Sequence, residues 1–181
     1  MAEPGLLLIR GLGHSGSTIL DLALGAHPQL IGLGEAVRVL ERPRLGEEHK
    51  GPQQLRGDLR FERRCTCGEL AGDWPVWGPL LAWLPAHDDR PLAEKCNRLI
   101  EPLTASSPRW LVESFQADEQ LLEAQAMGRP VRVIQLTRDV RSWVHSESRR
   151  GVERHGRGGT VGWRSMLRWW RINRRWEQRL N

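Results

Sequence analysis

Short apolar runs and helical patterns alternate along this chain. Four runs are rich in Leu, Ile and Val: 6–9, 30–34, 110–114 and 131–137. Runs of this length between turn residues are typical of buried strands. Segments 17–26 and 118–127 instead carry apolar residues at helical spacing. Because strands and helices alternate, we predict an α/β fold with a central parallel sheet flanked by helices.

The remaining segments predict further helices and one long interruption. Apolar residues recur at helical spacing in 76–84, 91–104 and 160–180. Residues 43–75 are rich in Pro, Gly and charge, which favours a surface insertion or lid. A length of 181 residues suits one domain, so we expect 1–181 to form a single one.

Three segments follow the ends of predicted strands: 11–18, 113–116 and 137–142. In parallel sheets, ligands bind at the carboxyl ends of the strands. We therefore expect these segments to lie along one rim and to contain the binding site.

The first of these segments, GLGHSGST, has the spacing of a phosphate-binding P-loop. A Gly-rich turn that opens a helix presents backbone N–H groups and the positive end of the helix dipole to an anion. Ser17 replaces the usual Lys, and His14 is the nearby side chain that can be cationic. The alternative is a plain strand-to-helix turn in which the serines only cap the helix.

An ATP- or GTP-hydrolysing loop requires more than this segment offers. Such loops use a Lys for the terminal phosphates and an Asp at the end of an apolar strand for Mg²⁺. Here one later strand ends in Glu113, and the other places Arg138 before Asp139. A P-loop small-molecule kinase is therefore the less favoured alternative.

Composition narrows the class of ligand. The net charge is +5, and all but Lys50 and Lys95 of the 27 basic residues are arginine, which suits phosphate and sulfate recognition. Biased codon usage explains much of that arginine excess. No nucleic-acid-binding motif accompanies the charge, so we expect a small anionic ligand and no nucleic acid.

The chain also lacks the marks of export or membrane insertion. It has no signal-like start and no apolar stretch long enough to span a membrane. Three cysteines are too few for a disulfide framework. We therefore expect a cytoplasmic protein.

Two segments resemble the sulfotransferases that use 3′-phosphoadenosine-5′-phosphosulfate (PAPS), particularly the bacterial and tyrosylprotein types. The first is GLGHSGSTILDLALGAHPQLIGLGE at 11–35, and the second is VIQLTRDVRSWVHSESRRG at 133–151. Their order and separation also match. The resemblance implies the P-loop-containing nucleoside triphosphate hydrolase-like fold of these enzymes, and it runs from about residue 5 to the chain end.

This resemblance assigns roles to individual residues. It implies that the 5′-phosphosulfate is bound by Gly13, His14, Ser15, Gly16, Ser17 and Thr18. His14 stands where relatives carry Arg or Lys, so it is also a candidate catalytic cation. Arg138 and Ser146 match the 3′-phosphate site, and Arg141 is a possible helper.

Glu35 is the candidate general base. It lies at the offset from His27 where tyrosylprotein-type relatives carry their catalytic glutamate, and a carboxylate there can accept the proton of an attacking hydroxyl. The alternative is a solvated Glu near a helix start. His27 itself is a second candidate, although we expect it to cap the preceding helix end.

The implied reaction is sulfuryl transfer from PAPS to a hydroxyl or amine of a small-molecule, peptide or glycan acceptor, without a metal. Two departures keep a non-catalytic nucleotide-binding relative open as an alternative. Gln116 stands where relatives carry Lys, and the resemblance predicts more chain after Asn181, as if the C-terminal part were truncated.

Two smaller features remain. Cys65 and Cys67 form a C-x-C pair for which we expect a structural role, because zinc needs four ligands. The helix predicted at 160–180 interleaves Trp with Arg. We expect it to pack on the core with its arginines extended to solvent, rather than to bind a membrane or nucleic acid.

Overall fold

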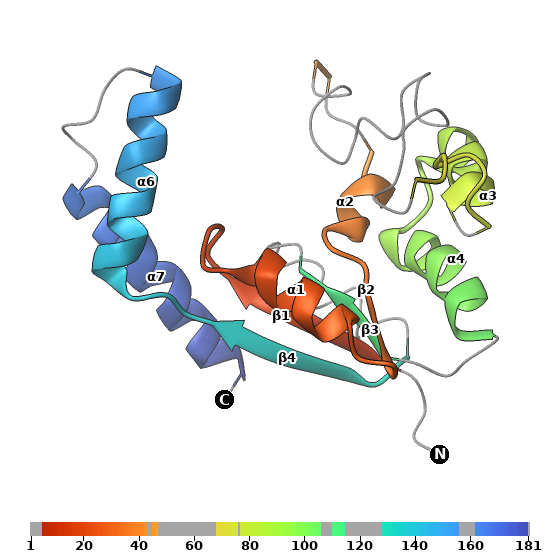
Figure 1. Ribbon diagram of the computed structural model, residues 1–181, viewed down its shortest axis with the longest axis horizontal. Coiled ribbons are helices and arrows are strands. Elements are labelled where there is room, and N and C mark those ends of the chain that lie inside the picture. Colours follow the sequence, from red (N-terminus) through yellow and green to blue (C-terminus); the bar gives the residue numbers. More distant parts are fainter. Residues whose placement is uncertain are drawn as a thin grey trace.

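Four parallel strands form the centre of the molecule. The computed structural model describes residues 5–42, 45–46, 68–75, 77–105, 110–114, 128–155 and 162–180. The strands are β1 (Leu6–Gly11), β2 (Leu30–Gly32), β3 (Trp110–Glu113) and β4 (Val131–Leu136). They pair in the order β2-β3-β1-β4 (Figure 1). This sheet confirms the predicted α/β class.

Six α-helices and one 3₁₀ helix are described around the sheet. They are α1 (Ser17–Gly25), α2 (Ala36–Leu40), α3 (Trp77–Trp83), η3 (Leu84–His87), α4 (Leu92–Ala105), α6 (Val140–His155) and α7 (Gly162–Leu180). The helices predicted at 17–26, 76–84, 91–104 and 160–180 are confirmed, whereas α2 and α6 were not predicted. The helix predicted at 118–127 and most of 43–75 lie outside the described residues.

The core lies where the sheet meets the helices. Leu6 and Leu8 of β1 and Leu111 of β3 belong to one buried cluster with Leu40 and Leu84 of the helices. Helices α2, α3 and α4 gather beyond β2 and β3, whereas α6 and α7 lie side by side beyond β4 (Figure 1). No helix in the described ranges is long and apolar enough to cross a membrane.

The strand order creates a switch point between β1 and β4. From β1 the chain passes through α1, which contacts β2 and β3, whereas from β4 it turns to α6 on the opposite side. The two connections therefore leave neighbouring strands in opposite directions. In open parallel sheets this divergence opens a crevice at the carboxyl edge, where ligands bind.

Candidate functional site

The loop after β1 opens helix α1 without a side-chain cap. Gly16 is the N-cap residue, in the left-handed conformation with φ 102°. The Ser15 N–H donates to the Leu12 carbonyl at 3.1 Å and closes a tight turn. Neither Ser15 nor Ser17 occupies the N-cap position. The alternative in which these serines serve only as caps therefore loses its basis.

His14 has an unusual backbone for a residue with a side chain. Its φ is 70°, the sole positive φ of a non-glycine among the described residues. Such conformations cost energy and persist only where the surroundings impose them. Two hydrogen bonds from the segment after β4 supply that constraint.

The segment after β4 forms two hydrogen bonds with the loop after β1. The Arg138 guanidinium donates to the His14 carbonyl at 3.0 Å, and the Trp143 indole N–H donates to the Gly13 carbonyl at 2.9 Å. Trp143 is only 1% exposed. Segments 11–35 and 133–151 therefore meet at the ends of the adjacent strands β1 and β4. We expected the loops after these strands to lie along one rim of the sheet.

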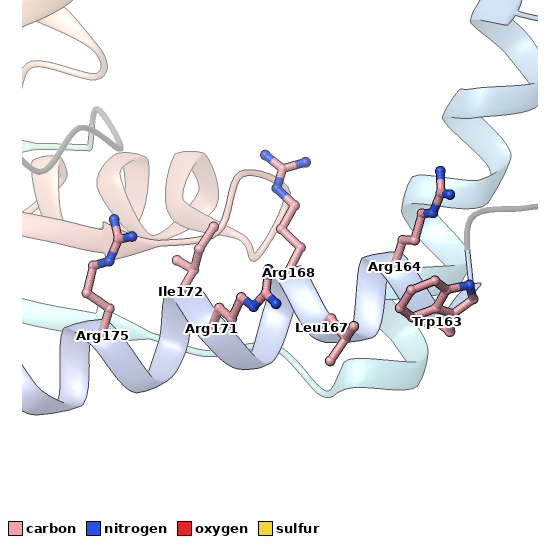
Figure 2. A pocket seen from close by; sticks show the side chains of 7 residues that line it. All are labelled: Trp163, Arg164, Leu167, Arg168, Arg171, Ile172 and Arg175. Atoms are coloured by element: carbon pink, nitrogen blue, oxygen red, sulfur yellow. The ribbon is translucent and has the colours of Figure 1, made fainter.

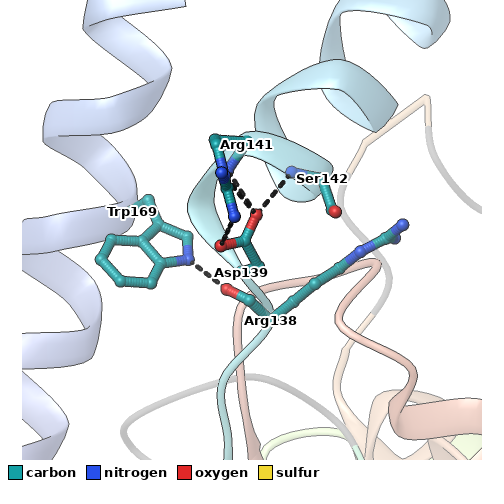
Figure 3. Close-up of polar contacts among 5 residues, drawn as sticks. All are labelled: Arg138, Asp139, Arg141, Ser142 and Trp169. Atoms are coloured by element: carbon teal, nitrogen blue, oxygen red, sulfur yellow. Dashed lines mark hydrogen bonds and ion pairs between the residues drawn. The ribbon is translucent and has the colours of Figure 1, made fainter.

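Asp139 directly precedes α6, and the first turn of that helix holds its carboxylate. Its carboxylate accepts hydrogen bonds from the backbone N–H groups of Arg141 and Ser142 and from the Arg141 guanidinium (Figure 3). The Ser142 N–H, followed by the Arg141 side chain, lowers the pKa of Asp139. Arg141, the possible helper, is thus engaged by Asp139. On the other side, the Trp169 indole donates to the Arg138 carbonyl at 2.8 Å.

One turn beyond Trp143, α6 carries two more polar residues, Ser146 and Glu147. Ser146 is half-buried. Glu147 lies between two cations: one oxygen is 3.9 Å from His14 Nε2, and the other is 3.9 Å from the Arg168 guanidinium of α7. The helical spacing of Trp143 and Glu147 explains why both face the loop.

Glu35 lies on the β2 side of the same edge. It is the N-cap residue of α2, its side chain is exposed, and it forms no capping hydrogen bond with the described residues. No contact among those residues joins it to His14 or Arg138. The alternative of a solvated Glu at a helix start therefore stands beside the general-base role.

A buried carboxylate holds the Glu35 segment in place. Asp21 of α1 is 3% exposed and accepts the Gly34 N–H, with its two oxygens at 3.1 and 3.3 Å from that nitrogen. Burial raises the pKa of Asp21, opposed by hydrogen bonds from the Ser114 side chain and the Gly34 backbone. Ser114 N–H donates in turn to the Gly34 carbonyl at 2.8 Å. Asp21 thereby ties the ends of β2 and β3 to α1.

A second buried charge joins β1 to β3 below the rim. The Arg10 guanidinium donates to a Glu113 carboxylate oxygen at 3.3 Å, with both side chains at most 3% exposed. Sequence reasoning did not select Arg10 or Asp21. The available signal was a charged residue inside an apolar run, which is rarely buried without a partner.

No family model matches this chain, and no curated protein or solved structure is significantly similar to it.

We expected His27 to cap the end of α1, but its side chain bonds within the following turn instead. Its Nδ1 accepts the Gln29 N–H at 3.2 Å, and its own N–H donates to the Leu24 carbonyl at the end of α1. These bonds shape the turn between α1 and β2. The structure thus gives His27 a turn-forming role.

A metal site can be sought only among the described residues. The described ranges contain no cluster of three His, Cys, Asp or Glu residues suited to a metal ion. Cys96 is buried in the core, whereas Cys65, Cys67 and Gln116 lie outside these ranges.

Helix α7 presents a basic surface, and its Arg168 contacts Glu147 of α6. Four arginines one turn apart form a groove of about 380 Å³ together with Trp163, Leu167 and Ile172; they are Arg164, Arg168, Arg171 and Arg175 (Figure 2). The expectation of a core-packing helix is only partly correct. Trp176 is buried, but Trp163 and Trp170 are 64% and 49% exposed.

Proposed function

We propose that this protein is a PAPS-dependent sulfotransferase with the P-loop-type fold of that family. It transfers the sulfuryl group to an acceptor hydroxyl or amine and releases adenosine 3′,5′-bisphosphate. The observation that carries the proposal is the hydrogen bond from Arg138 to the His14 carbonyl. It joins the loop that resembles a 5′-phosphosulfate site to the segment that resembles a 3′-phosphate site.

The geometry supports a ligand with two separate anionic groups. The first turn of α1 contains no acidic residue, so its N–H groups, with the hydroxyls of Ser15, Ser17 and Thr18, favour a tetrahedral anion. Arg138 extends from the neighbouring loop and suits bidentate contact with a second phosphate. Ser146 on α6 adds a hydroxyl to that second group. One bisphosphorylated nucleotide thus accounts for both features.

The proposed reaction is an in-line displacement at sulfur. The acceptor oxygen forms the new S–O bond as the bond from sulfur to the 5′-phosphate oxygen breaks, and the electron pair leaves with the phosphate. Glu35 accepts the acceptor's proton, and a protonated His14 stabilises the charge that develops on the leaving oxygen. His14 thus takes the part of the cation that relatives carry at this position.

A specific contact argues against an ATP·Mg²⁺ kinase. Glu113 closes β3 at the position where a metal-binding carboxylate is expected, but its oxygen lies 3.3 Å from the buried Arg10 guanidinium. An internal arginine already neutralises that carboxylate. Asp139, the other candidate, is engaged by Arg141 and the start of α6. A nucleotide recognised without Mg²⁺ fits this edge better.

Calorimetric titration tests the proposal directly. We expect adenosine 3′,5′-bisphosphate to bind the full chain more tightly than ATP·Mg²⁺. Arg138→Ala should weaken bisphosphate binding about 10- to 100-fold, because a charge-assisted hydrogen bond is worth roughly 1.5–3 kcal/mol. Arg132→Ala, an exposed arginine on β4 that stacks on Trp110, is the matched control and should leave affinity unchanged.

Turnover separates an enzyme from a binding relative. Glu35→Gln should retain bisphosphate affinity but lose release of adenosine 3′,5′-bisphosphate from PAPS in the presence of hydroxyl acceptors. Binding of ATP·Mg²⁺ without binding of the bisphosphate would overturn the sulfotransferase proposal. Full activity of Glu35→Gln would remove Glu35 as the base.

A further inference from the structure

The three-residue chain His14–Glu147–Arg168 links the P-loop-like segment to both C-terminal helices. His14 Nε2 lies 3.9 Å from one Glu147 oxygen, and the Arg168 guanidinium lies 3.9 Å from the other. The His14 and Glu147 side chains are 39% and 23% exposed, so water only partly screens their interaction. A carboxylate beside an anion site is unexpected, because it repels the ligand unless it serves a neighbouring cation.

The packing of α6 on the loop after β1 brings the His14 backbone close to Glu147. The carbonyls of Gly13 and His14 are both held by donors that follow β4, and φ of His14 is fixed at 70°. Trp143, which holds the Gly13 carbonyl, lies one turn before Glu147 on the same face of α6. The packing of α6 on the loop therefore sets the distance between the His14 and Glu147 backbones.

The charges around His14 oppose one another. Glu147 favours the protonated imidazole, whereas Arg138 of the β4 connection, Arg168 of α7 and the positive end of α1 all disfavour it. Among the described residues, Glu147 is the carboxylate that an ion pair places beside His14. Glu147 thus acts in favour of the His14 cation, and Arg168 acts against it.

We infer that Glu147 is a positioning residue that keeps His14 protonated before the anionic ligand arrives, and that Arg168, as the second cation beside Glu147, weakens this effect. The role of His14 toward a phosphosulfate rests on the proposed function. The coupling of the three side chains is independent of the proposed function, because these contacts exist in the protein without ligand.

Removal of the Glu147 charge and removal of the Arg168 charge should move the His14 titration midpoint in opposite directions. A purely structural role of the two residues does not produce opposite shifts. In an NMR pH titration of the full chain, with His14→Gln used to assign the signal, Glu147→Gln should move the His14 midpoint to lower pH. Arg168→Gln should move it to higher pH. Each shift should be about half a pH unit, as expected for a partly exposed pair. Glu177→Gln and Arg175→Gln on α7 make the same charge changes and should leave the midpoint in place.

Ligand binding then tests the positioning role. The affinity for adenosine 3′,5′-bisphosphate should fall as pH rises through the His14 midpoint, and in Glu147→Gln this fall should begin at lower pH. Unchanged midpoints, or midpoints that move in the same direction in both variants, overturn the coupling. Midpoints that shift as expected without any bisphosphate binding overturn the proposed function and leave the coupling standing. Binding with the same pH profile in wild type and Glu147→Gln overturns the positioning role alone.

Discussion

Buried polar residues fix the positions of the loops at the candidate site. Asp21 reaches from α1 to the Gly34 backbone, just before Glu35. Trp143 reaches from α6 to the loop after β1. In both cases a side chain from a helix satisfies a backbone group that an irregular loop leaves without a secondary-structure partner. The loops at the carboxyl edge are thus held by single hydrogen-bonding residues that come from elsewhere in the chain.

The raised pKa of Asp21 predicts a pH dependence of stability. Burial, the largest cause, raises this pKa above its ordinary 3.8. The folded state therefore holds the Asp21 proton more tightly than the unfolded chain. Its favourable contribution is complete below about pH 3.8 and is lost as pH rises through the raised value. Above that value the ionised carboxylate carries a constant desolvation cost.

Urea unfolding of wild type and Asp21→Asn at a series of pH values measures this effect. The stability of wild type relative to Asp21→Asn should decrease as pH rises from 3.8 through the raised pKa, and then level off. Asp89→Asn, at an exposed position, serves as the control and should show no such trend. A constant difference between wild type and Asp21→Asn would contradict the assignment.

At the scale of elements, the strands of the sheet could be predicted from the sequence, whereas helix α6 could not. Each strand coincides with an apolar run, because buried parallel strands need continuous Leu, Ile and Val. Helix α6 has few apolar residues and was missed, although Asp139 directly before Val140 is a typical residue for a helix N-terminus. The same limit applies to the site. Its loops were predicted from local motifs, whereas the contacts of Glu147 and Trp143 depend on how α6 packs.

The pairing of β1 with β4 depends on a glycine. A Cβ at Gly11 would collide with the Leu136 carbonyl oxygen, whereas a Cβ at Gly13 meets no atom within 4 Å. Gly11→Ala should therefore destabilise the fold by about 2–3 kcal/mol, because backbone atoms of a neighbouring strand have little room to move. Gly13→Ala should cost less than about 1 kcal/mol. Urea unfolding of both variants gives the comparison, and equal losses would exclude the close approach as the cause.

The pairing of β1 with β3 contains the buried Arg10–Glu113 ion pair. Glu113→Gln removes this carboxylate from beside the buried Arg10 guanidinium and should cost about 3–5 kcal/mol. The double variant Arg10→Met/Glu113→Leu should recover most of that loss, because both charges are then replaced by apolar side chains. A double-mutant cycle in urea, with Arg10→Met and Glu113→Leu as its single variants, measures the coupling. A double variant as unstable as Glu113→Gln would show that the pair is required as a pair.

At the scale of the whole molecule, α7 joins the end of the chain to its beginning. Trp176 lies in the same buried cluster as Leu6 and Leu8 of β1. The Asn173 side-chain oxygen accepts hydrogen bonds from Gln135 and Thr137 at the end of β4. The helix thereby covers the β1–β4 half of the sheet, the half that carries the candidate site. The alternation of Trp and Arg predicted the helix but not which tryptophans face the core, because more than one face of α7 carries Trp.

Two tryptophans of α7 provide a matched pair that tests this packing. Trp176 is 2% exposed and Trp170 is 49% exposed, with the Arg174 guanidinium 5.0 Å from the Trp170 ring centre. Trp176→Ala leaves a cavity in the core and should cost about 3–5 kcal/mol. Trp170→Ala removes mainly an exposed cation–π contact and should cost less than about 1 kcal/mol. Because both changes delete the same side chain from one helix, helix propensity cancels between them. If urea unfolding gave equal losses, α7 would not be docked through Trp176, and the Trp169 contact that holds the Arg138 carbonyl would lose its support.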